Sequence, residues 1–177
     1  MYYVKQKVQK IKKIELRSIN QDNWRNCADL QTSQEQLDLW RQFTLLQDTY
    51  GVVANVLSLA DASVYPSAQT FAIYAGESMV GFVAYEPLRD TPDNSGYSIY
   101  RFMIDFRYQG MGYGRQALQE VVGLLSQKAD CREIYTTVMP ENHIARTLYR
   151  SAGFQDTGDI EDGEVVMRFP VAETAQP

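Results

Sequence analysis

The segment FMIDFRYQGMGYGRQALQEVV, residues 102–122, constrains the fold more than any other part of the chain. A strand-like apolar run is followed by glycines at alternate positions, Gly110, Gly112 and Gly114, and then at once by a helical pattern. Because glycine lacks a Cβ, the backbone can turn sharply there and bring several N–H groups to a ligand, with the positive end of a helix behind them. The segment predicts an anion-binding turn, although a tight turn without a ligand would also need one or two glycines.

Two well-known phosphate-binding motifs do not fit this turn. No Gly-Lys-Ser/Thr follows the glycines, as a nucleoside triphosphate site would need, and the G-x-G-x-x-G spacing of dinucleotide sites is missing. The net charge of −5 disfavours binding to nucleic acid. Apolar runs are shorter than the roughly 20 residues of a membrane span, and the lysine-rich start lacks the apolar region of a signal peptide. We therefore expect a cytoplasmic protein that binds neither membranes nor nucleic acid.

Periodicity predicts alternating strands and helices around the turn. Strands are expected over residues 13–19, 71–75, 79–86, 97–104 and 133–139, and helices over residues 24–30, 34–59 (broken near 49–51) and 142–152, as well as directly after the glycines. Gly76-Glu77 and Asp162-Gly163 are expected to close hairpins, the second over residues 154–169, and Gly153 to end the last helix. These elements indicate one α/β domain over residues 13–170, a loop over 88–96, and mobile ends at residues 1–12 and 171–177.

A second segment, MPENHIARTLYRSAGF at residues 139–154, helps to identify the ligand of the glycine turn. Asn142 stands at the expected helix start, and Tyr149 lies seven residues later on roughly the same helical face. Residues 107–112 (RYQGMG) resemble the acetyl-CoA signature Q/R-x-x-G-x-G/A of the GNAT superfamily of N-acetyltransferases, and NHIARTLYRSAGF resembles its second motif, N-x-x-A-x-x-L-Y-x-x-x-G-F. Within that superfamily the pattern is most similar to bacterial spermine/spermidine (polyamine) acetyltransferases.

The resemblance implies a fold and a co-substrate. The fold would be α/β (α+β), with a mixed, mostly antiparallel central sheet of six or seven strands, about four helices, and a splayed strand pair that holds acetyl-CoA. No metal is implied. The cofactor residues carried over are Phe102, Met103 and Ile104 beside the pantetheine, Arg107, Gln109, Gly110, Met111, Gly112, Tyr113, Gly114 and Arg115 around the pyrophosphate, and Asn142 and Tyr149 on the later helix. Read from the residues alone, the arginines could be solvated, Asn142 a helix cap, and Tyr149 part of the core.

The implied reaction is direct acetyl transfer to a primary amine, with Tyr149 as the proton donor to the departing thiolate. The only histidine, His143, follows Asn142 at a helix start where exposed polar residues are common, so no paired nucleophile is indicated. Some polyamine acetyltransferases carry a glutamate on the strand before the signature, whereas this chain has Tyr100 and Arg101 there. Glu86 is a candidate general base acting through water, or an ordinary glutamate at a strand end.

The acceptor is the least determined part of the prediction. A polyamine needs separated carboxylates and aromatic faces, and the segment before the first hairpin offers Glu35, Asp38 and Trp40 as substrate-binding residues, with Asp48, Tyr50 and Asp61 nearby. The alternatives are another amine (an aminoglycoside, an amino acid or a protein N-terminus) or a non-catalytic acyl-CoA-binding sensor. A homodimer also remains open.

Overall fold

The computed structural model describes residues 12–43, 51–88 and 95–172; expectations for the remaining residues lie outside these ranges. The strands are β1 (Ile14–Ser18), β2 (Gln69–Ala75), β3 (Ser78–Pro87), β4 (Gly96–Ile104), β5 (Glu133–Val138), β6 (Gln155–Glu161) and β7 (Glu164–Pro170). The α-helices are α1 (Trp24–Ala28), α2 (Gln34–Phe43), α3 (Gly51–Val64), α4 (Tyr113–Ser126) and α5 (His143–Ser151), and η1 (Phe106–Tyr108) is a short 3-10 helix. The expected mixed α/β fold is confirmed, with five α-helices described where about four were expected.

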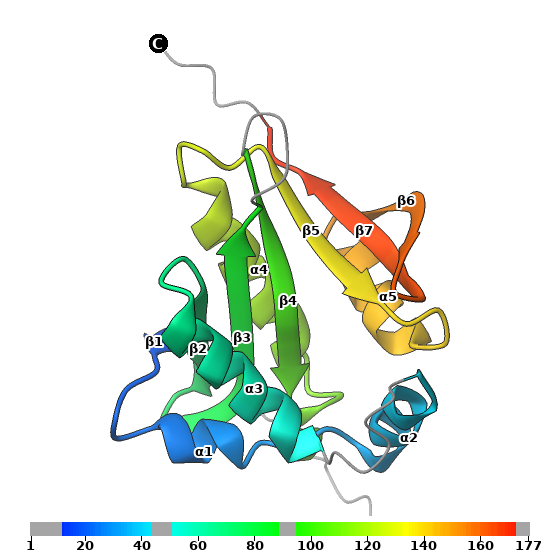
Figure 1. Cartoon of the computed structure of the whole chain (residues 1–177). Helices are drawn as coiled ribbons and strands as arrows, with labels where there is room; N and C mark the ends of the chain where they lie inside the picture. Colours follow the sequence, from blue (N-terminus) through cyan, green and yellow to red (C-terminus); the bar gives the residue numbers. More distant parts are fainter. Residues whose placement is uncertain (1–11, 44–50, 89–94, 173–177) are drawn as a thin grey trace, which may run out of the picture.

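The strands form one seven-stranded sheet in the order β1-β2-β3-β4-β5-β7-β6 (Figure 1). Every neighbouring pair is antiparallel except β4 and β5, which run parallel. Only three residue pairs join these two strands, from Gly96↔Glu133 to Ser98↔Tyr135, although β4 continues to Ile104. The strands then diverge, as Figure 1 shows at their lower ends. This is the expected splayed pair, and it leaves one edge of β4 without a strand partner beyond Ser98.

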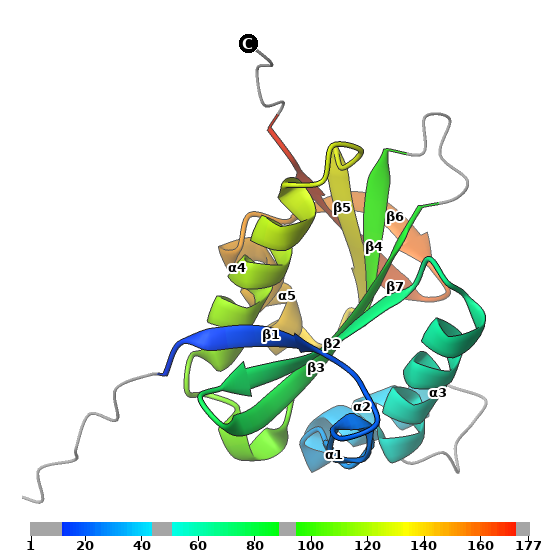
Figure 2. The same cartoon turned by 90° about the vertical axis from the view of Figure 1, so that its left-hand side faces the viewer.

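Helices cover both faces of the sheet (Figure 2). α4 and α5 lie on one face, where Leu118, Ile134, Tyr149 and Met167 belong to the larger buried cluster. α1, α2 and α3 lie on the other face, where Cys27, Leu30 and Phe82 form a second, smaller cluster. β4 is therefore covered from both sides, and any ligand at its unpaired edge lies between the two helical layers.

The backbone conformations of the turn residues agree with the expected hairpins and with the expected end of the last helix. Gly76 has a φ of 64° between β2 and β3, while Asp162 and Gly163, with φ of 49° and 85°, close the β6–β7 hairpin. Gly153 has a φ of 103°, and a Cβ there would lie 2.9 Å from the Phe169 ring. Because an L side chain is strained in this backbone region and would meet the ring, glycine is required at that position.

Two helix boundaries differ from expectation. α1 ends at Ala28 instead of residue 30, because the buried Asn55 side chain donates to the carbonyls of Cys27 and Leu30 and satisfies them outside a helix. α3 continues to Val64, well beyond residue 59, because no helix-breaking residue intervenes before Pro66. The longer α3 carries Asp61 over the sheet, where it lines a cavity described below.

Candidate active site

The glycine turn exposes the start of α4. Gly110 and Gly112 have φ of 72° and 84°, and Gly112 is the N-cap residue of α4, so no side chain caps this helix end. The first N–H groups of a helix lack an intrahelical acceptor, and they carry its partial positive charge. Three such donors, from Tyr113, Gly114 and Arg115, therefore stand at the turn. This arrangement is suited to an anion such as a pyrophosphate.

A buried carboxylate holds the turn in place. Asp105, which is fully buried, accepts hydrogen bonds from the backbone N–H of Gln31 at 3.1 Å and of Arg107 at 3.0 Å. The Arg107 guanidinium pairs with the same carboxylate, with Nε at 2.7 Å. Burial alone would raise the pKa of Asp105, but these hydrogen bonds outweigh it and hold the pKa below its usual value. Asp105 thus ties the turn to the segment between α1 and α2.

A second link joins the turn to β4 and α2. The side-chain amide nitrogen of Gln109 donates to the carbonyl oxygen of Ile104 at 2.8 Å and to Oε1 of Gln36 at 2.9 Å. One side chain therefore connects the end of β4, the turn and helix α2. Sequence analysis did not single out Gln36, because no local pattern relates residues 73 positions apart.

A cavity of about 590 Å³ opens between the turn, β4 and α5. It is lined by Gln36, Phe102, Met103, Ile104, Gln109, Gly110, Gly112, Gly114, Arg115, Gln116, Asn142, Ile144, Ala145, Thr147, Leu148, Tyr149 and Ser151. Ten of the thirteen expected cofactor residues are in this lining. The other three lie elsewhere: Arg107 is held by Asp105, Met111 is exposed, and the Tyr113 ring is buried against Tyr108.

Asn142 takes the helix-cap position with only part of its side chain. Oδ1 accepts a hydrogen bond from the N–H of Ala145 at 3.1 Å, which caps α5. The side chain also lines the cavity, and the amide nitrogen has no hydrogen bond within the described part of the chain. Sequence analysis gave Asn142 as a cofactor residue or, from the residues alone, as a helix cap. The structure divides these two roles between the two ends of one amide group, so the nitrogen can donate to a ligand.

Tyr149 belongs to the core and to the cavity at once. Only 6% of the residue is exposed, and its ring packs against Phe154 at 5.4 Å and Phe102 at 6.4 Å between ring centroids. Burial raises the pKa of the phenol, which a hydrogen bond with Thr136 partly offsets. A phenol in this environment stays protonated, as a proton donor must.

A second cavity, of about 440 Å³, lies on the α3 side of β4. It is lined by Asp61, Tyr65, Ala68, Glu86 and Tyr100. Burial, together with the charges of Glu86 and Asp61, raises the pKa of Tyr100 to about 12. The Tyr100 hydroxyl is buried and has no hydrogen-bond partner among the described residues. A buried hydroxyl without a partner is costly, which is typical of a position where a ligand completes the hydrogen bonding.

The acceptor residues expected on α2 lie elsewhere. Glu35 and Asp38 are exposed, Asp38 accepts a hydrogen bond from Gln34 at 2.8 Å, and neither residue lines the two cavities. The side chain of Trp40 falls outside what the structure describes. Glu86, the candidate base, lies in the second cavity.

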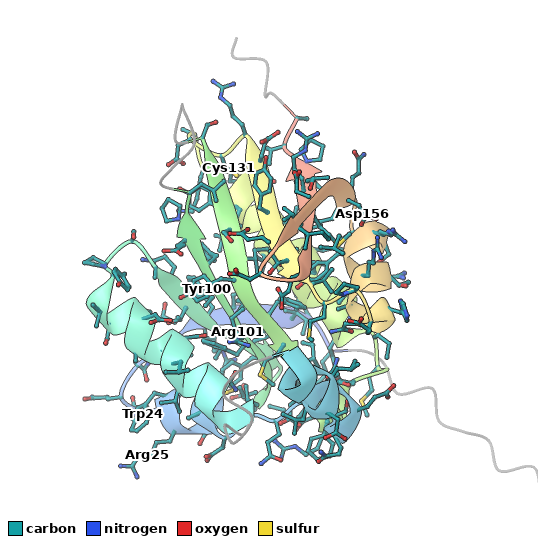
Figure 3. The ribbon with its side chains drawn as sticks, turned by 45° about the vertical axis from the view of Figure 1, so that its right-hand side comes forward. Trp24, Arg25, Tyr100, Arg101, Cys131 and Asp156 are labelled. Carbon is teal, nitrogen blue, oxygen red and sulfur yellow. The ribbon has the colours of Figure 1, made fainter. Side chains whose placement is uncertain are left out.

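Arg101 was noted in the sequence only as a departure from the family. It follows Tyr100 at a β-bulge, where the β3–β4 register passes from Ala84↔Arg101 to Tyr85↔Ile99 and leaves Tyr100 without a strand partner. Its Nε donates to the buried Ser58 of α3 at 3.2 Å. Figure 3 shows Tyr100 and Arg101 at successive positions of β4. The bulge places both residues beside the splay.

The described residues do not indicate catalysis by a cysteine nucleophile or by a metal ion. Cys27 and Cys131 are buried thiols whose pKa values burial raises to about 12 and about 11, so neither is an activated nucleophile. The described ranges contain no group of three or more His, Cys, Asp and Glu residues that could hold a metal ion. Within them, no helix is both long and apolar enough to cross a membrane.

Comparison with known proteins agrees with this geometry. The model of the acetyltransferase (GNAT) family matches residues 17–154. The spermine/spermidine N(1)-acetyltransferase of Bacillus subtilis (strain 168) is 30% identical over 158 residues, which is 87% of this chain and 96% of that protein.

Two solved structures share the fold. An aminoglycoside acetyltransferase, AAC(6')-Ib in complex with ribostamycin and coenzyme A, has a TM-score of 0.73 at 19% identity over 89% of this chain and 93% of that one. A chimera of the Vibrio cholerae spermidine N-acetyltransferase SpeG has a TM-score of 0.66 at 16% identity over 89% and 95%. The chain belongs to the acetyltransferase (GNAT) family, which confirms the resemblance in the two motifs and, with it, acetyl-CoA as the co-substrate.

Proposed function

We propose that the chain transfers the acetyl group of acetyl-CoA directly to a primary amine of a polyamine such as spermidine or spermine. The observation that carries the acceptor class is the second cavity, in which two carboxylates, Asp61 and Glu86, stand beside the rings of Tyr65 and Tyr100. Carboxylates and aromatic faces are the groups that bind ammonium ions. The Bacillus subtilis relative, which is named for spermine and spermidine, supports the same class.

The first cavity fits the co-substrate. The glycine turn offers backbone N–H groups to a pyrophosphate, the unpaired edge of β4 offers hydrogen bonds to an extended amide chain, and Asn142 offers its amide nitrogen. Tyr149 lies at the inner end of this path, beside Phe102 of β4. When bound there, acetyl-CoA supplies an activated acyl group as a thioester.

The chain's residues would then assist one displacement. The amine nitrogen forms a bond to the carbonyl carbon, the carbon–sulfur bond breaks, and the sulfur takes the proton of Tyr149. The backbone N–H of Ile104 or a neighbour on β4 is the proposed donor to the carbonyl oxygen. The nitrogen gives up its extra proton to water, with Glu86 as the proposed proton acceptor beyond that water. No acyl-enzyme is needed, in agreement with the buried, protonated thiols.

A turnover assay with a panel of acceptors tests the proposal. Spermidine, spermine, putrescine, a monoamine of equal length and an aminoglycoside are compared at two salt concentrations. Spermidine and spermine should be preferred at least tenfold over the monoamine, and the preference should shrink at high salt, because exposed charges are screened over about 10 Å at 0.1 M ionic strength. If the monoamine or the aminoglycoside is the better substrate, the polyamine assignment fails and only acetyl transfer stands.

A further inference from the structure

Arg101 of β4 carries a positive charge in a largely enclosed position. Its side chain is largely enclosed and burial lowers its pKa, yet a guanidinium keeps its charge at any ordinary pH. Within residues 12–43, 51–88 and 95–172, its one hydrogen bond goes to Ser58, and no carboxylate lies within ion-pair distance. A largely buried charge without a direct partner is costly, so a function that needs the charge is the natural explanation.

Arg101 lies in the sequence between two residues that line different cavities. Tyr100, the preceding residue, lines the acidic cavity, and Phe102, the following residue, lines the cofactor cavity. The groups that act on Arg101 electrostatically come from four elements: Asp61 of α3, Glu164 of β7, Tyr149 of α5 and Tyr100 of β4 itself. Arg101 itself lines neither cavity; its guanidinium, bonded to Ser58 of α3, interacts through space with charged and polar groups on either side of the splay.

The chemistry at this point requires an uncharged amine. The pKa of a free alkylamine is about 10, so at neutral pH almost all of it is protonated and has no lone pair for attack. A nearby positive charge disfavours the protonated form of a base, as it does for a lysine activated by a neighbouring cation.

We propose that the positive charge of Arg101 keeps the attacking nitrogen neutral, while Asp61 holds a distal ammonium group of the same acceptor. The two charges of opposite sign orient the polyamine: its charged part stays in the acidic cavity and its neutral end lies at the splay. Arg101 thereby takes over part of the task of a general base by an electrostatic route. This inference rests on the proposed acetylation of a polyamine.

The test is the pH dependence of kcat for spermidine in Arg101→Gln, because kcat reports the protonation of groups within the enzyme–substrate complex. Removing the charge should move the acidic limb of the profile to higher pH by about one unit, which is about a tenfold loss at pH 7. Arg101→Lys should restore most of the wild-type profile, because it keeps the charge. Arg25→Gln, on the exposed helix α1 at the edge of the molecule (Figure 3), removes the same charge far from the splay and should leave the profile unchanged.

A second substrate separates electrostatics from structure. A fluorinated spermidine analogue with a weakly basic reacting nitrogen is already neutral at pH 7, so its acetylation should lose little in Arg101→Gln. If Arg101→Gln does not fold, Ser58→Ala removes the hydrogen bond that places the guanidinium and should shift the limb in the same direction by a smaller amount.

Three outcomes would overturn the inference. If the acidic limb of Arg101→Gln does not move, or if the variant loses activity equally at every pH and only through KM, Arg101 has no electrostatic role. Polyamine acetylation would still stand. Failure of the wild-type protein to acetylate spermidine would refute the proposed function and this inference together.

Discussion

The carboxylate of Asp105 accepts hydrogen bonds from Nε and Nη2 of Arg107 at 2.7 and 3.0 Å, although the aspartate side chain has no exposed surface. The arginine of the signature motif therefore serves the folded structure of the turn. The pyrophosphate contacts proposed for the turn come from backbone N–H groups, to which Arg115 at the cavity wall adds a positive charge.

The first prediction concerns Asp105→Asn. The substitution keeps the shape but removes the charge, so the free energy of unfolding should fall by about 2 kcal/mol, the usual value for hydrogen bonds to a charged group. Denaturant titration measures the loss, and Asp159→Asn, at an exposed position of β6, is the control.

The same variant should change the pH dependence of stability. Because the folded-state pKa of Asp105 is lowered, its contribution is present above the unfolded pKa of about 4 and is lost as the pH falls through the folded value. The difference between wild type and Asp105→Asn should therefore shrink in acid. A constant difference from pH 7 to pH 2 would contradict this account of the turn.

The second prediction concerns the glycine turn. Gly112→Val places a β-branched side chain at a φ of 84°, where L residues are strained, and should abolish the rise in melting temperature that acetyl-CoA produces in the wild-type protein. Gly123→Ala is a matched control, because a Cβ at this position of α4 meets no atom within 4 Å. It should raise stability by roughly 0.5 to 1 kcal/mol and keep the response to acetyl-CoA. Stabilisation of the wild type by ATP but not by acetyl-CoA would refute the proposed ligand.

The third prediction concerns Tyr149→Phe. If the phenol protonates the departing thiolate, kcat should fall by roughly ten- to a thousandfold with little change in acetyl-CoA affinity. Because burial raises the pKa of Tyr149, its ionisation should not reduce wild-type activity until the pH exceeds about 10. Steady-state kinetics across pH 6 to 10 measure both effects. Unchanged turnover would leave Tyr149 as a packing residue only.

The fourth prediction compares two sets of carboxylates. Asp61→Asn should raise the KM for spermidine by about tenfold, since it removes a charged partner for an ammonium group, and should affect a monoamine less, whereas Glu86→Gln should lower kcat for both acceptors. The controls are Glu35→Gln and Asp38→Asn, which neutralise exposed residues of α2 outside the cavity. If the α2 variants raise the KM for spermidine more than Asp61→Asn does, the acceptor binds at α2, as sequence analysis expected.

The sequence by itself determined the order of the strands and helices, the glycine turn and the capping of α5. These features follow from local rules. Alternation and helical spacing mark the elements, glycine permits the positive φ of residues 110, 112 and 153, and Asn142 caps the helix that it precedes. The two motifs were enough to place ten residues in the lining of one cavity, because these residues lie within two short segments of the chain; Gln36 of the same lining was not foreseen.

Only the tertiary structure decided the rest. The acidic cavity joins Asp61 of α3 to Glu86 of β3, and Gln109 reaches Gln36 across 73 positions, so no local pattern could place these residues together. Nor could a pattern foresee that the carboxylate of Asp105 would be buried against the backbone of Gln31, or that Arg101 would bond to Ser58 of α3, because both contacts join distant segments of the packed chain. Local sequence sets the backbone path, whereas the partners of buried charges are chosen by packing between distant segments.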